Sequence, residues 1–194
     1  MNLFIVDLET TGLDPSVHEI IEIGCVNVTT GETFEVKVRP LHIKDAQPEA
    51  LKVNGYNEAD WEEAFLLPNA LKLLTQFLYA GDDVAPRYMM AYNVSFDRAF
   101  LEKAYRDCNM VYPFHYNHLD LLTMVWDRHW NRLEVTSLKN TCKALSIPPE
   151  PEVHRALGGA QAAFEVYKKL TTSTSGDKEL RLSNPEGWHG PRRV

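Results

Sequence analysis

The alternation of apolar and polar residues near the start of the chain predicts three strands joined as an antiparallel meander. The apolar run at 3–6 is short and rich in branched side chains, and it predicts a buried strand over residues 2–8. Residues 19–28 alternate as a second strand, and residues 33–38 return as a third after a turn signal.

Helical spacing dominates the pattern after the meander. Apolar residues recur three and four positions apart between residues 67 and 78, which predicts a helix ended by Gly81. Residues 88–92 predict a central strand. Four further helical patterns follow, at 96–105, 118–130, 136–146 and 155–170. The order predicts an α/β fold, with a mixed central sheet of three antiparallel strands and then strand–helix units, flanked by helices.

Composition bounds the domain organisation. At 194 residues the chain is most simply one domain, and residues 1–170 carry the periodic patterns. From residue 171 the sequence becomes polar and rich in Gly and Pro, so we expect a C-terminal tail over 171–194. No apolar stretch reaches the length of a membrane span and no signal peptide is recognised, so a cytoplasmic location is expected. The three cysteines lack paired spacing and are expected to be reduced.

Two carboxylates stand at the end of the first strand. Asp7 and Glu9 are two positions apart, so both point to the same face of the sheet, with Leu8 pointing to the other. Carboxylates about 7 Å apart repel each other unless a cation lies between them. Oxygen ligands of this kind suit a divalent metal, whereas the alternative interpretation is a strand that simply runs into a polar turn.

Two later motifs favour the metal site. Asn93 precedes a helix that begins with Phe96-Asp97, and His154 follows a proline-rich stretch at the start of the last helix. Taken alone, Asp97 could be an acid favoured at a helix N-terminus, and His154 could be a surface or capping histidine. The acid pair, the Phe-Asp helix start and the late histidine in this order resemble the DnaQ-like 3′→5′ exonucleases. These form the His-containing branch of the DEDD group, which includes polymerase proofreading subunits, and the resemblance covers residues 2 to 170.

The resemblance implies a fold, two metal ions and a role for each motif residue. The fold would be ribonuclease-H-like, and the cofactors would be two Mg²⁺ or Mn²⁺ ions. The residue matching Asp7 bridges both metals, the residue matching Glu9 binds the water-activating metal, and the residue matching Asp97 helps to hold the second. The residue matching His154 is the general base, a role that suits histidine.

The resemblance also implies contacts with a nucleic-acid end. Backbone N–H groups near Thr10 and Thr11 would bond the terminal 3′-hydroxyl and phosphate, and Leu13 would wedge against the last base. The remaining expected substrate contacts are Gly55, Tyr56, Asn93 and Phe96. For Leu13 and Tyr56, ordinary boundary packing is an equal alternative. Apolar stacking tolerates any base, so weak sequence preference is expected.

The expected partners are single-stranded DNA 3′ ends, with RNA as an alternative, and a polymerase or another replication or repair protein. Thr10 stands where oligoribonuclease-like relatives usually carry Met, which tilts the prediction toward DNA. The net charge of −7 argues against a tight binder with a long duplex footprint.

One position departs from the family pattern. The family has an aspartate five residues after the histidine, whereas this chain has Gly159, inside a Gly-Gly pair that costs a helix about 1 kcal/mol per glycine. Either a deliberate replacement or a natural loss explains it, and nothing in the spacing requires Glu152 to substitute. We expect weakened metal binding and low turnover with single-strand binding retained. The competing hypotheses are a non-cleaving module that binds nucleic-acid ends and an RNA-trimming exoribonuclease.

Overall fold

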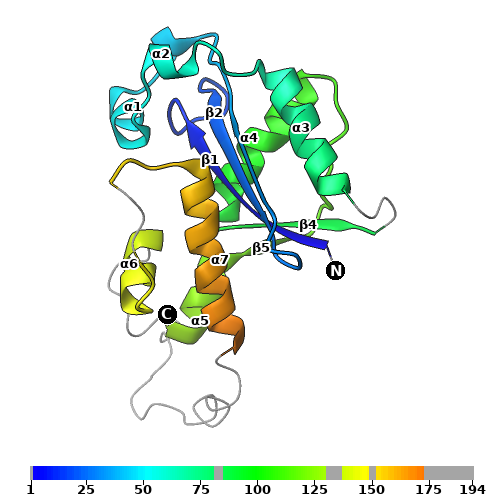
Figure 1. Ribbon diagram of the computed structural model, residues 1–194, viewed down its shortest axis with the longest axis vertical. Helices are drawn as coiled ribbons and strands as arrows, with labels where there is room; N and C mark the ends of the chain where they lie inside the picture. The colour runs from blue at the N-terminus through cyan, green and yellow to red at the C-terminus, as the bar shows by residue number, and fades with distance from the viewer. Residues whose placement is uncertain (1, 81–84, 130–136, 149–151, 173–194) are drawn as a thin grey trace, which may run out of the picture.

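A five-stranded mixed sheet forms the centre of the molecule (Figure 1). The computed structural model describes residues 2–80, 85–129, 137–148 and 152–172. The strand order is β3-β2-β1-β4-β5. The strands are β1 (Asn2–Thr10), β2 (Ile20–Asn27), β3 (Thr33–Lys37), β4 (Arg87–Ala91) and β5 (His118–Asp120). Pairing is antiparallel through β1, β2 and β3 and parallel from β1 to β4 and β5, which confirms the predicted meander and mixed sheet.

Helices cover both faces of this sheet. They are α1 (Pro48–Asn54), α2 (Glu58–Trp61), α3 (Leu67–Tyr79), α4 (Val94–Asp107), α5 (Leu121–His129), α6 (Leu138–Ala144) and α7 (Ala156–Thr172), with a 3₁₀ turn at Ile43–Asp45. Buried residues of α3 and α4 belong to one apolar cluster, and those of α5, α6 and α7 belong to a second. The sheet separates the two clusters, and α7 runs along one of its faces (Figure 1).

The alternation in β1 determines which face carries the acids. Phe4, Val6 and Leu8 lie in the cluster with α3 and α4, while Leu3 and Ile5 lie in the cluster with α7. Because side chains alternate along a strand, positions 7 and 9 continue the α7 face. The first strand therefore places its two carboxylates under the last helix.

Two parts of the predicted element order were wrong. Residues 118–120 form strand β5 beside β4, and the helix expected from 118 begins only at Leu121. Helices α1 and α2 were not predicted, although Pro48 at the first turn of α1 and Gly55 in the left-handed conformation after it are ordinary helix boundary signals.

Several expectations lie outside the described residues, among them the glycine at 81 and the tail beyond residue 172. Within the described residues, no helix is both long and apolar enough to cross a membrane. All three cysteines are free, as expected.

Candidate active site

The acid pair lies where β1 loses one of its neighbours. Strand β1 pairs with β4 only from Asn2 to Ile5, whereas its pairing with β2 continues to Thr10. Beyond Ile5 the edge of β1 that faced β4 is open, next to the carboxyl ends of two parallel strands. Ligand sites of α/β sheets lie at such points. Asp7 and Glu9 are both partly exposed there.

Asp97 occupies this open edge. Its Oδ1 accepts the Leu8 N–H at 3.0 Å, so a residue of α4 bonds the strand between the two acids. Asp97 is only 3% exposed. Burial raises its pKa well above the usual range, and the negative charge of Glu9 raises it further. A cation beside these groups would favour the charged form of the carboxylate.

Asp120 fixes the start of α4, which carries Asp97. Asn93 adopts a left-handed conformation with φ of 67°, and the next residue, Val94, donates its N–H to Asp120 Oδ2 at 2.7 Å. The other carboxylate oxygen accepts the Thr123 N–H at 2.7 Å. One side chain thus caps the first turns of α4 and α5, and it supports Asp97 indirectly.

Gly159 of α7 packs directly on Asp7. A Cβ atom at position 159 would lie 2.6 Å from the Asp7 Cγ and closer still to its Oδ2. The Asp7 carboxylate therefore lies where the side chain of a fourth acid would begin. This contact provides a packing reason for the glycine that the sequence did not reveal.

His154 stands on a segment that is tied to the body of the protein. Its N–H donates to the Val53 carbonyl at 3.0 Å. The two residues after it both bind Glu22 of β2, through Arg155 Nη1 at 2.9 Å and the Ala156 N–H at 3.2 Å. Burial raises the pKa of Glu22, while these two partners lower it. Sequence reasoning missed Glu22, although a lone carboxylate in an apolar strand was a visible signal.

The two threonines expected to bind substrate use their polar groups internally. Thr10 Oγ1 donates to the Gly12 carbonyl at 2.7 Å, and the Thr10 carbonyl accepts from Asn54 Nδ2 at 3.0 Å. The Thr11 N–H donates to the Glu19 carbonyl, and Thr11 Oγ1 accepts the Glu19 N–H, both at 2.8 Å. A ligand would compete with these bonds. Asn54 is buried, and its side chain joins the loop at 53–56 to the end of β1.

The remaining candidate contacts differ in exposure. Leu13 is 71% exposed, as a residue that meets a base would be. Tyr56 is half-buried, with its ring 5.1 Å from that of Trp61, and Phe96 packs on Phe100 with ring centroids 5.0 Å apart. The structure brings Gly55 against the Val153 side chain, next to His154. The loop at 53–56 and the histidine segment are therefore neighbours.

The donor chemistry at the end of β1 suits a hard divalent cation. The residues that could hold it are Asp7, Glu9 and Asp97, which offer carboxylate oxygens. Among the described residues, no three His, Cys, Asp or Glu side chains are gathered closely enough to form a ready metal-binding group. Glu22 adds no free ligand to this set, because its carboxylate binds Arg155 and the Ala156 N–H at the start of α7.

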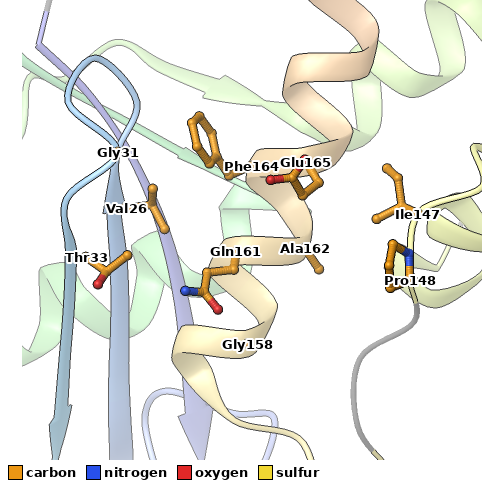
Figure 2. A pocket seen from close by; sticks show the side chains of 10 residues that line it. All are labelled: Val26, Gly31, Thr33, Ile147, Pro148, Gly158, Gln161, Ala162, Phe164 and Glu165. Atoms are coloured by element: carbon orange, nitrogen blue, oxygen red, sulfur yellow. The ribbon is translucent and has the colours of Figure 1, made fainter.

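Two hollows elsewhere on the surface lie apart from this site. One of about 550 Å³ borders α7, with Gly158, Gln161 and Ala162 on its wall (Figure 2). Another of about 490 Å³ lies between the loop at 15–19 and helices α3 and α4. Asp7, Glu9, Asp97 and His154 line neither hollow.

Comparison with known proteins identifies the family. A family model described as exonuclease (RNase_T) matches residues 4–167. The DNA polymerase III subunit epsilon of Rickettsia prowazekii is 28% identical over an alignment of 177 positions, gaps included, and the alignment covers 86% of this chain and 72% of that protein. Ribonuclease T of Klebsiella pneumoniae is 27% identical over an alignment of 201 positions, gaps included, and the alignment covers 94% of this chain and 91% of that protein.

Longer relatives match over a small part of their length. A putative bifunctional exonuclease/endonuclease protein of Mycobacterium tuberculosis is 31% identical over an alignment of 178 positions, gaps included, which covers 86% of this chain. The chain spans 26% of that protein, and 7% and 12% of two PolC-type DNA polymerases III, from Mycoplasmopsis pulmonis and Thermotoga maritima.

A solved structure shows the same fold. The nuclease domain of 3'hExo, described as a DEDDh family member bound to rAMP, superposes with a TM-score of 0.71 at 19% identity, covering 89% of this chain and 92% of that one. The sheet and its helices therefore form a ribonuclease-H-like α/β domain of the kind found in nucleases. The chain belongs to the RNase_T exonuclease family, and its DnaQ-like resemblance is confirmed.

Proposed function

We propose that this chain is a metal-dependent 3′→5′ exonuclease for DNA 3′ ends whose hydrolytic step is impaired by Gly159. The observation that carries the proposal is the site at the open edge of β1, where Asp97 bonds the strand between Asp7 and Glu9. The contact between Gly159 and Asp7 at the same site supports the impairment.

The residues of the site would divide the work of phosphodiester hydrolysis. Asp7, Glu9 and Asp97 would hold Mg²⁺ or Mn²⁺, which supplies charge neutralisation and an acidified water when bound. His154 would accept the proton of the attacking water. Leu13 and Tyr56 would contact the terminal base, with Gly55, Asn93 and Phe96 shaping the surrounding loops. Thr10 and Thr11 would meet the terminal 3′-hydroxyl and phosphate through their backbone.

The missing fourth carboxylate explains the expected impairment. The three remaining acids carry at most three negative charges against two divalent ions, one fewer than with an aspartate at position 159. Fewer ligands and less negative charge weaken cation binding. We therefore expect nucleic-acid ends to bind while turnover stays low.

The test is digestion of a 5′-labelled single-stranded DNA oligonucleotide with Mg²⁺ and then Mn²⁺, for this chain and for Gly159→Asp. We expect a ladder shortened from the 3′ end only with the Asp variant. Ladders from both proteins would show that the fourth acid is dispensable. No ladder from either, with oligonucleotide still bound, would overturn the enzymatic proposal.

A thermal-stability measurement accompanies the digestion. The added carboxylate must displace that of Asp7 and repel it, so Gly159→Asp should lower Tm without metal. Excess Mg²⁺ should then raise Tm more in the variant than in the parent, because ligands that bind only the folded state stabilise it. An equal Mg²⁺ effect in both proteins would contradict a role of position 159 in metal binding.

Two alternative functions have specific support. Gly159 favours a non-cleaving module that binds nucleic-acid ends, and similarity to Ribonuclease T favours RNA as substrate. The same digestion with an RNA oligonucleotide separates DNA from RNA preference.

We propose residues 1–170 as the exonuclease domain and 171–194 as a tail, with a polymerase or repair protein as partner. The cytoplasmic location stays a prediction.

A further inference from the structure

Glu22 is a buried carboxylate beside the candidate site. It is 1% exposed and lies in register between Glu9 of β1 and Lys37 of β3. Directly paired residues of neighbouring strands point to the same face, so Glu22 shares the α7 face with Glu9. Its carboxylate binds both Arg155 and the Ala156 N–H at the start of α7.

A fixed indole holds Arg155 in place from another direction. Trp61 of α2 is 1% exposed, and its Nε1–H donates to the Ile21 carbonyl at 2.9 Å. The Arg155 Cζ lies 5.1 Å from the centre of this ring, within the range of a cation–π contact. The guanidinium of Arg155 thus contacts both the Trp61 ring on α2 and the Glu22 carboxylate on β2.

The backbone on both sides of His154 is held by these contacts. Before it, the His154 N–H binds the Val53 carbonyl. After it, the next two residues bind Glu22, and the Ala156 peptide presses so closely on Gly24 that a Cβ there would collide with it. This leaves the histidine little freedom beyond rotation of its own side chain.

We propose that Glu22 is a positioning residue that fixes the backbone of His154, and so the point from which its side chain extends, relative to the acid pair. The proposal rests on the proposed role of His154 as general base. A buried ion pair adds little net stability over apolar packing, and its best-supported use is to specify one arrangement. In this protein, the ion pair would specify the placement of the first residues of α7 over β2.

The test uses Glu22→Gln, with Glu35→Gln as a matched control. Glu35 lies on the neighbouring strand β3, is exposed, and loses the same charge. Both substitutions are made in this chain and in Gly159→Asp. In the Asp background, Glu22→Gln should lower kcat about ten- to a hundredfold while KM changes less than about twofold, because small misplacement of a catalytic group acts on the chemical step. The control should leave both constants unchanged.

A second set of measurements does not depend on activity. Hydrogen exchange at residues 154–157 should speed up in Glu22→Gln while the centre of α7 stays protected, and the His154 ring should change from one set of NMR signals to several. Arg155→Met, which keeps packing on Trp61, should produce a smaller effect of the same kind. It replaces Glu22→Gln as the test variant if the latter fails to fold.

The outcomes separate this proposal from the proposed function. If Gly159→Asp shows no turnover, that result contradicts the proposed function. The hydrogen-exchange and NMR data then test the positioning role of Glu22 on their own. Unchanged exchange and a single His154 signal set in both Glu22→Gln and Arg155→Met would overturn the positioning role. The positioning role would also be overturned if Glu22→Gln lowered the free energy of unfolding but left kcat unchanged in the Gly159→Asp background.

Discussion

Two adjacent glycines at the start of α7 face different surroundings. Gly159 lies against the Asp7 carboxylate, where a Cβ has no room. Gly158 borders the hollow beside α7 (Figure 2). Outside the backbone of its own helix, the nearest atom to its Cβ position is the Arg155 Cβ, at an ordinary contact distance of 3.9 Å. The pair therefore allows the packing constraint to be separated from helix propensity.

Gly158→Ala should raise the free energy of unfolding by about 0.5–1 kcal/mol, because alanine favours the helix and meets open space. Gly159→Ala gains the same propensity but must displace the Asp7 carboxylate, so its stabilisation should be smaller or negative. Urea denaturation of both variants measures the difference. Equal stabilisation by the two substitutions would mean that Asp7 does not constrain position 159.

The sequence was informative about single residues where a local rule applies. The two-residue period of a strand was enough to predict that Asp7 and Glu9 share a face, and the chain order of motifs added Asp97 and His154 as candidates. The contact of Gly159 with Asp7 and the burial of Glu22 depend on where α7 crosses the sheet. A long-range crossing of this kind leaves no periodic trace in the sequence.

Helices α3 and α4 are joined by a buried hydroxyl. Tyr105 of α4 is fully buried, and its OH lies 2.9 Å from Thr75 Oγ1 and donates to the Leu71 carbonyl at 3.2 Å, both on α3. Burial raises the pKa of Tyr105 to about 12 from its ordinary value of 10.0. The folded protein therefore holds the phenol proton more tightly than the unfolded chain does.

This difference predicts a loss of stability in alkali. Because the folded pKa is the higher one, the contribution of Tyr105 is complete below pH 10 and is lost as pH rises toward 12, by roughly 2–3 kcal/mol. Tyr105→Phe should lower the free energy of unfolding by about 1 kcal/mol near neutral pH, where the substitution only removes hydrogen bonds. Its stability should then approach or exceed that of the parent at about pH 11.5. Chemical denaturation at the two pH values measures this, and a constant gap would contradict the prediction.

At the scale of elements, long periodic segments were predicted well and short ones were not. The stripe between residues 67 and 78 became α3, which spans Leu67–Tyr79. Strand β5 has three residues and α2 has four, too few to display a period. Their conformations come from neighbours, since β5 pairs with β4 and Trp61 of α2 is buried beside β2.

The charge of the whole molecule limits how it can hold nucleic acid. The net charge of −7 repels a polyanion, and the acid pair and Asp97 add to that repulsion locally. A bound divalent cation would reverse the local sign at the site while the net charge of the chain stays negative. Under the proposed function, the molecule would hold a few terminal nucleotides at one point, with few other phosphate contacts.

Binding through few phosphate contacts predicts a weak dependence of affinity on monovalent salt. For single strands the slope of log K against log salt is about −0.7 per phosphate contacted, so about three contacts give a slope near −2. Affinity should increase with Mg²⁺ or Mn²⁺ and should stop rising once the oligonucleotide exceeds about four nucleotides, because the net negative charge of the chain disfavours further phosphate contacts. Fluorescence anisotropy with oligonucleotides of increasing length, at fixed Mg²⁺ and varied KCl, measures both quantities. A slope steeper than about −4, or affinity that keeps rising with length, would show a long binding track and contradict recognition of the end alone.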